Sequence, residues 1–194
     1  MPTRMVSITH ALRNVSLTLL ALVAMSAHAG VIEPVRGQLD PTDKGYALIS
    51  QFAIDLGSSL EDALSRGVPL VFTLEFTIER KRWYWFDEQI VHRTIDYRLS
   101  YNALTQQYRL ATEGRQDSYA TLADALLMLG KVDGLVVAEK KAIRLGNAYT
   151  AELRMSLDKR QLPKPFQLDA LASKDWQVEA IPLNWQFAPG VVGR

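Results

Sequence analysis

Histidines come first in a search for catalysis, because hydrolytic triads and many metal sites depend on an imidazole. The chain has three histidines and no cysteine, which excludes disulfides, thiolate metal sites and a catalytic thiol. His10 and His28 lie in a segment that we expect to be removed on export, so only His92 remains. The alternation of apolar and polar residues predicts that His92 lies on the solvent-exposed face of a strand. We therefore predict a surface histidine, with no catalytic residue, no metal and no cofactor.

Two pairs of neighbouring carboxylates and one acidic loop were the other candidates for chemistry. Glu61-Asp62 falls in the first turn of a predicted helix, and Asp87-Glu88 belongs to a charged hairpin. The loop at residues 40–45 lacks the alternating oxygen ligands and the closing glutamate of a calcium-binding loop. All three read as structural features, and we predict that the protein is not an enzyme.

Residues 80–86 form the most unusual segment, because three cations are followed directly by four aromatic residues. Trp, Tyr and Arg dominate protein-binding hot spots, and such residues also suit the headgroup layer of a membrane. The alternative is that a tryptophan caps the core while the cations face water. Export and a net charge near zero argue against a nucleic-acid partner. The candidate partner-binding residues are Arg80, Arg82, Trp83, Tyr84, Trp85 and Phe86.

The N-terminal segment has the parts of a secretory signal peptide. Arg4 and Arg13 precede an apolar run at residues 15–25, and the small residues Ala27 and Ala29 flank His28. This run is shorter than the about 20 apolar residues that a spanning helix needs. We predict a signal peptide at residues 1–29 and a periplasmic location, with an uncleaved anchor as the alternative. Cleavage would change the net charge from +1 to −1, because two arginines leave.

The segments that must position these residues show a period of two, which is typical of antiparallel strands with one buried face. In residues 70–79, apolar residues alternate with threonine and glutamate, and residues 46–56, 91–101 and 149–158 alternate in the same way. We predict one β-rich domain at residues 30–194, with residues 30–45 as a loose lead-in. The expected fold is an antiparallel β-sandwich of immunoglobulin-like size with two or three short helices.

Turns and helix signals give the expected connections. If Ile78 faces Val91, the same register puts Leu74 opposite Ile95 and Lys81 opposite Glu88. Further hairpins are expected to turn at residues 102–107 and 146–148. We expect helices from a capping box at Ser58, at residues 121–129 and at residues 166–172. A last strand is expected at residues 176–180.

Residues 97–110, with the sequence YRLSYNALTQQYRL, resemble the core motif of an uncharacterised family of exported proteobacterial proteins, a domain of unknown function. The likeness extends across the mature chain to Trp176 and Trp185. Members of this family are commonly encoded beside a nitrogen-regulation-type sensor histidine kinase and its response regulator. The family motif has histidine where this chain has Asn102, so any chemistry that depends on that histidine would be absent. The resemblance implies export and a link to two-component signalling, and it supplies no catalytic residues.

These observations together predict a non-catalytic, exported protein-binding domain. A membrane sensor kinase is the candidate partner, and peripheral contact with a membrane is a further expectation. The alternative is a periplasmic carrier that holds a lipid or a small apolar ligand between its sheets.

Overall fold

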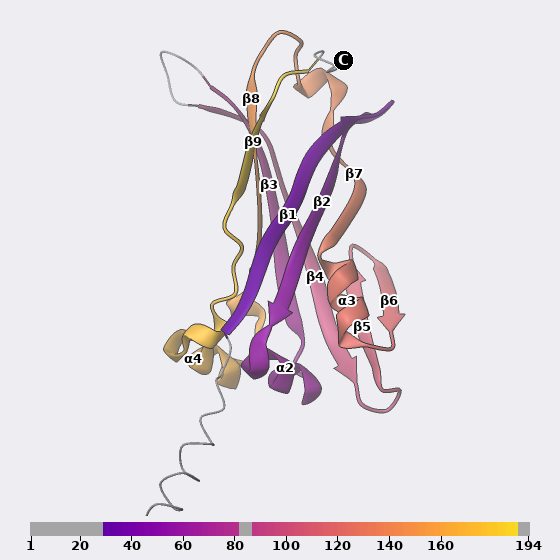
Figure 1. Cartoon of the computed structure of the whole chain (residues 1–194), viewed down its shortest axis with the longest axis vertical. Helices are drawn as coiled ribbons and strands as arrows, with labels where there is room; N and C mark the ends of the chain where they lie inside the picture. The colour runs from indigo at the N-terminus through magenta and orange to yellow at the C-terminus, as the bar shows by residue number, and fades with distance from the viewer. Residues whose placement is uncertain (1–28, 82–86, 190–194) are drawn as a thin grey trace, which may run out of the picture.

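Two antiparallel β-sheets face each other across a shared apolar core in the computed structural model (Figure 1), which describes residues 29–81 and 87–189. The smaller sheet has the order β1-β2-β7 and the larger has the order β6-β5-β4-β3-β8-β9. The smaller sheet contains β1 (Ala29–Pro41), β2 (Gly45–Leu56) and β7 (Lys131–Glu139). The larger contains β3 (Leu70–Arg80), β4 (Glu88–Asn102), β5 (Gln107–Thr112), β6 (Arg115–Tyr119), β8 (Tyr149–Leu157) and β9 (Leu183–Phe187). The predicted antiparallel β-sandwich is confirmed.

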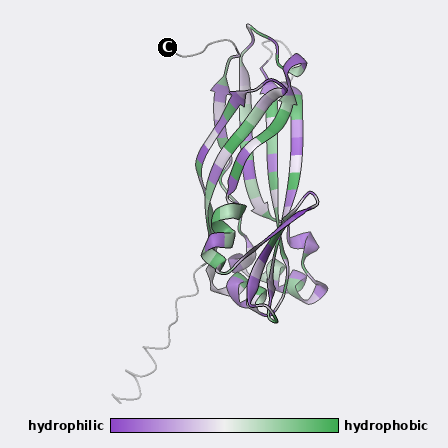
Figure 2. Cartoon of the chain, turned by 90° about the vertical axis from the view of Figure 1, so that its right-hand side faces the viewer, coloured by the Kyte–Doolittle hydropathy of each residue, from purple (hydrophilic) through white to green (hydrophobic). Residues whose placement is uncertain are grey.

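The core follows the period-two pattern of the sequence. On β3, the residues Leu70, Phe72, Leu74, Phe76 and Ile78 are each 1% exposed or less. Thr73, Glu75 and Thr77 between them are only partly buried, whereas Val71 is buried like its neighbours. Figure 2 shows hydrophobic and hydrophilic residues alternating along the strands in the same way. Burial of one face of each strand therefore fixes which side chains point between the sheets.

The predicted register of β3 and β4 is confirmed over most of their length. Ile78 pairs with Val91 and Leu74 with Ile95. Beyond Ile78 a bulge shifts the register, and Arg80 forms the ion pair with Glu88 that we had expected for Lys81. That expectation was wrong because one extra residue on β4 is accommodated without a partner, which regular alternation does not reveal.

The hairpin predicted at residues 102–107 is confirmed, since Asn102 pairs with Gln107 and Tyr101 with Tyr108. The Asn102 side-chain oxygen accepts a hydrogen bond from the Leu104 backbone N–H at 3.0 Å, which stabilises the turn. The position that departs from the family motif therefore has a local structural role in this chain.

The prediction of a loose lead-in at residues 30–45 was wrong, because β1 occupies most of this segment. Gly37 and Pro34 conceal the strand pattern, and the register shifts between Pro34 and Arg36. Proline is tolerated on an edge strand, where a missing N–H leaves no central partner unsatisfied. As an edge strand of the smaller sheet, β1 meets that condition.

Two further strand predictions near the C-terminal half were wrong. Residues 146–148 do not turn a hairpin onto β8, because β8 already pairs with β3 on one edge and β9 on the other. The strand expected at residues 176–180 is reduced to a single bridge between Glu179 and Ser156. The strand β9 pairs with β8 instead, after Pro182 interrupts the pattern.

Within residues 29–81 and 87–189, three short helices complete the fold: α2 (Gly57–Ser65), α3 (Leu122–Leu129) and α4 (Lys164–Ala172). Helices predicted at residues 121–129 and 166–172 are confirmed. The capping box at Ser58 was wrong, because α2 begins at Gly57, whose N–H donates to the Asp55 carboxylate at 2.8 Å. The short 3₁₀ turns are η1 (Lys140–Ala142), η2 (Lys159–Gln161) and η3 (Lys174–Trp176). None of the helices in the described part of the chain is long and apolar enough to cross a membrane.

Candidate functional site

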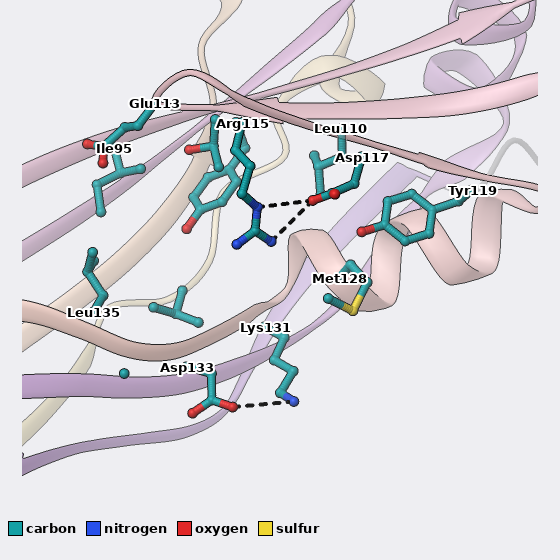
Figure 3. A pocket seen from close by; sticks show the side chains of 14 residues that line it. Ile95, Leu110, Glu113, Arg115, Asp117, Tyr119, Met128, Lys131, Asp133 and Leu135 are labelled. Carbon is teal, nitrogen blue, oxygen red and sulfur yellow. Dashed lines mark hydrogen bonds and ion pairs between the residues drawn. The ribbon is translucent and has the colours of Figure 1, made fainter.

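A cleft of about 520 Å³ opens between the sheets, beside β7 and the inner face of β4–β6 (Figure 3). It exists because the larger sheet has twice as many strands as the smaller one, and β7 is the last strand of the smaller sheet. The helix α3 packs against β5, β6 and β7 and covers only one end. Its lining comprises Ile95, Tyr97, Leu110, Thr112, Glu113, Arg115, Asp117, Tyr119, Met128, Lys131, Val132, Asp133, Gly134 and Leu135. We call this feature the inter-sheet cleft.

The floor of the inter-sheet cleft is apolar and well ordered by strand pairing. Ile95 and Tyr97 of β4 are each 8% exposed, and Leu110 of β5 is 7% exposed. Because these residues alternate inward with the rest of the core, they continue the apolar surface of the sandwich out to its open side. A ligand in the cleft would therefore rest on a hydrophobic floor.

The wall formed by β6 carries charges on the inward face. Arg115 pairs with Thr112 and Asp117 with Leu110, so the two charged residues share the face of Leu110. Their side chains form an ion pair at 3.1 Å, drawn in Figure 3. Inward-pointing charge on a short edge strand also discourages edge-to-edge aggregation. The same charges give the cleft polar groups that can orient a bound molecule.

The opposite wall is the irregular strand β7. Lys131 and Asp133 form an ion pair at 3.6 Å, and Gly134 adopts a positive φ of 72°. The pairing with β2 shifts register between Leu48 and Ser50, opposite this part of β7. Among the described residues, β7 pairs with β2 only, so its other edge presents unpaired backbone to the cleft.

Burial and nearby carboxylates raise the pKa of both cleft tyrosines above the ordinary value of a phenol. Burial raises the pKa of Tyr97, Glu113 raises it further, and Arg115 opposes both effects. For Tyr119, burial and then Asp117 raise the pKa, again against Arg115. A raised phenol pKa favours the neutral form, so both groups act as hydrogen-bond donors and acceptors rather than as bases.

Buried polar atoms near the cleft lack partners in the described part of the chain. The Thr112 hydroxyl oxygen is buried without a hydrogen bond, and Thr112 lines the cleft. The Ser50 hydroxyl oxygen is also unpartnered, and Ser50 pairs in register with the cleft residue Val132. Unsatisfied buried hydroxyls are uncommon in folded proteins.

The residues predicted as a partner-binding surface are only partly described. Arg80 lies at the end of β3 and pairs with Glu88. Arg82, Trp83, Tyr84, Trp85 and Phe86 lie outside the described residues, so their predicted role stays a prediction.

The other residues considered for chemistry are dispersed. His92 lies on the exposed outer face of the larger sheet, where its ring contacts Thr77 and Thr94 at 3.4 and 3.3 Å. Asp62 is paired with Arg66 on α2. The loop at residues 40–45 is a turn, in which the Thr42 hydroxyl donates to the Gly45 carbonyl at 3.0 Å. Over residues 29–81 and 87–189, no group of three His, Cys, Asp or Glu side chains is placed to hold a metal ion.

The sequence offered a ligand between the sheets as an alternative, but it identified none of the residues that line the inter-sheet cleft. The sequence contains one usable signal. Arg115, Asp117 and Tyr119 are two residues apart, so they would share one face of a strand. Charges on the inward parity of a strand indicate either an edge or a site. The pattern does not say which strands the smaller sheet covers, so the location of the cleft needed the structure.

The N-cap of α3 supports the closed end of the cleft and provides a stability test. The Thr121 hydroxyl accepts a hydrogen bond from the Asp124 backbone N–H at 3.1 Å. We expect Thr121→Ala to lower the free energy of unfolding by about 1 kcal/mol, measured by urea denaturation. Thr121→Ser retains the hydroxyl and serves as the control. An alanine variant as stable as the parent would show that this cap contributes nothing.

The fold and the cleft define a class: a two-sheet antiparallel β-sandwich domain with an open, mixed apolar and charged cleft between its sheets. Residues 31–186 match the family described as Domain of unknown function (DUF4390), and the chain belongs to this family. The resemblance to an uncharacterised family is thereby confirmed, while export and gene neighbourhood stay predictions. No match was found among curated proteins or among solved structures.

Proposed function

We propose that this chain is an exported, non-catalytic binding domain whose inter-sheet cleft receives an extended segment of a protein partner. The observation that carries the proposal is the position of the cleft between the unpaired edge of β7 and the apolar floor of β4 and β5. An extended segment added to a free strand edge gains main-chain hydrogen bonds, and its alternate side chains can enter the neighbouring pocket.

The lining supports a polypeptide over a lipid. Five charged side chains line the cleft, and two pairs of them, Arg115–Asp117 and Lys131–Asp133, offer both signs of charge. Sites for apolar ligands are lined mainly by hydrophobic groups with only a few polar ones. A polypeptide brings backbone donors, acceptors and charged side chains that this lining can satisfy. A carrier of a lipid or small apolar ligand is the alternative.

The hydrogen-bonding groups of the cleft support a binding role. The cleft phenols have raised pKa values, its two cations are ion-paired, and His92 lies on the other face of the sheet. General acid–base catalysis needs a group that exchanges its proton near the working pH. The cleft residues supply hydrogen bonds and charge, which serve recognition.

The partner we propose is a membrane sensor kinase, in the periplasm of the cell. The support is the N-terminal sequence, with its cations, apolar run and small residues before residue 30, and the resemblance to a family encoded beside such kinases. The surface at residues 80–86 remains a second candidate contact with the same partner.

Site-specific crosslinking in living cells tests the cleft directly. A photoreactive amino acid replaces Met128, which lines the cleft and is 37% exposed, or its neighbour Leu127, which is 58% exposed and does not line it. We expect the probe at Met128 to capture one protein through a single short stretch of its sequence, and the probe at Leu127 to capture far less of it.

Charge reversal in the cleft separates specific from adventitious capture. Asp117→Arg with Asp133→Arg is expected to lower the Met128 adduct at least about tenfold, because unpairing interfacial charges is costly. Glu152→Arg, on the exposed outer face of β8, is the matched control and should change nothing. Equal capture from both probe positions, or capture insensitive to charge reversal, would refute the proposal. Capture of a lipid-sized molecule alone would favour the carrier.

A further inference from the structure

The helix α4 presents apolar residues on two faces, and only one face has a partner in the fold. Ala170 is buried and Phe166 contacts the Trp176 ring at 5.8 Å, which fixes the inner face. Leu168 and Leu171, three residues apart on the other face, are 71% and 78% exposed. A short surface helix normally turns a polar face to water, so an exposed leucine pair at this spacing indicates a further contact.

Cations flank this exposed face along the chain. Lys159 and Arg160 lie in η2, directly before α4, Lys164 begins the helix, and Lys174 lies in η3 directly after it. Both η2 and η3 pack against α4. Residues 158–176 hold these four cations and three carboxylates, Asp158, Asp169 and Asp175, so their net charge is +1. Arg160 forms an ion pair with Asp158 at 3.0 Å, which leaves the three lysines as the cations available to a ligand. Exposed leucines bordered by lysines suit the surface of an anionic membrane, because anionic lipids attract basic segments.

The N-terminal end of the described chain lies at the same end of the sandwich (Figure 1). Ala29 forms a bridge with Gly57 at the start of α2, and Gly30 packs so closely on Val178 that a Cβ would lie 2.8 Å from that side chain. Both α2 and α4 contact η3. The chain therefore enters the fold beside the helices that carry the exposed leucines.

The sequence before Ala29 makes a bilayer the natural occupant of this face. The apolar run ends at Met25, and only three residues separate it from Ala29. Four residue steps span at most about 14 Å, even when fully extended. In the uncleaved form of the chain, in which the apolar run stays in the membrane, the α4 end of the domain must lie within that distance of it.

We propose that, in the uncleaved form of the chain, the face of α4 carrying Leu168 and Leu171 rests on the anionic bilayer that holds the N-terminal segment, with its leucines in the headgroup layer. Lys159, Lys164 and Lys174 contact the lipid phosphates. This orientation leaves the inter-sheet cleft, on the side of the sandwich, open to partners on the same membrane. The inference does not depend on what the cleft binds.

Fluorescence quenching on the full chain tests this orientation, because a chain without cysteine allows single labels. A lipid-sensitive fluorophore is attached at Ala172→Cys, beside the leucines, or at Ala148→Cys, an exposed alanine before β8 at the opposite end. The protein is reconstituted in vesicles of phosphatidylglycerol and phosphatidylethanolamine that contain a lipid-borne quencher. We expect strong quenching at residue 172 and little at residue 148.

Leucine replacement identifies the contact. Leu168→Asp with Leu171→Asp is expected to abolish most quenching at residue 172, whereas Leu145→Asp, at a leucine that is 76% exposed at the other end, should leave it unchanged. Circular dichroism confirms that each variant is folded. Equal quenching at the two label positions, or quenching at residue 172 that survives the double replacement, would overturn the proposal.

Discussion

Replacing Phe76 by alanine is expected to lower the free energy of unfolding by about 3–5 kcal/mol, the range for removing a fully buried phenylalanine. Phe76 is 1% exposed on the central strand β3, and its ring lies 6.2 Å from the Trp185 ring. It pairs with Leu153 of β8 in register, so the vacated volume is bordered by strands on both sides and cannot collapse freely. Loss of this ring therefore costs both hydrophobic transfer and a cavity.

Urea denaturation followed by tryptophan fluorescence measures this effect, because Trp185 adjoins the substituted position. Leu104→Ala is the control, since Leu104 is 97% exposed in the turn after β4 and its loss should change stability by less than about 0.5 kcal/mol. If Phe76→Ala were as mild as Leu104→Ala, the two sheets would not share the packed core described above.

The strands that could be predicted are those whose environment is uniform along their length. Period two in residues 70–79 was enough to place Phe76 inward and to fix the pairing of Ile78 with Val91. A one-residue slip would expose the whole apolar set of β3, so burial alone specifies this register. The bulge after Ile78 leaves the hydrophobic pattern of the strand unchanged, so the pattern does not predict it.

The cleft could not be predicted because it depends on how far one sheet overhangs the other. Arg115 and Asp117 occupy inward positions that would be forbidden under a covering sheet, yet they are allowed because β7 is the last strand of the smaller sheet. No local pattern in the sequence indicates that the smaller sheet ends at β7. The edge of the smaller sheet is set by pairs of residues that are distant in sequence, such as Ser50 with Val132.

Membrane seating and cleft binding are consistent with one arrangement. The helix α4 lies at the end where the chain enters the fold (Figure 1). The cleft is lined by residues of β6 and β7 on the side of the sandwich. If the α4 end of the domain contacted the membrane, the cleft would stay accessible to a partner on the same membrane. Restricting the protein to that surface would raise its effective concentration toward a membrane partner.

Gly45→Ala is the second substitution with a large expected effect, because it acts on the strand that forms the cleft wall. A Cβ at Gly45 would lie 1.9 Å from the Ala138 carbonyl oxygen of β7, and the glycine has a φ of 150°. Backbone cannot yield as a flexible side chain does, so the start of β2 must separate from the end of β7. We expect a loss of about 2–4 kcal/mol of folding free energy from overpacking and backbone strain combined.

A second glycine, Gly146, separates the effect of the steric clash from the effect of the positive φ. Gly146 also has a positive φ, of 82°, but no atom lies within 4 Å of its Cβ position, so Gly146→Ala should cost only about 1–2 kcal/mol. In hydrogen exchange, Gly45→Ala should lower the protection of β7 amides, whereas Gly146→Ala should not. If the two variants lost equal stability and β7 stayed protected, the close approach of β2 to β7 would not hold the cleft wall in place. Reduced protection of β7 together with weaker crosslinking at Met128 would instead tie partner capture to that wall.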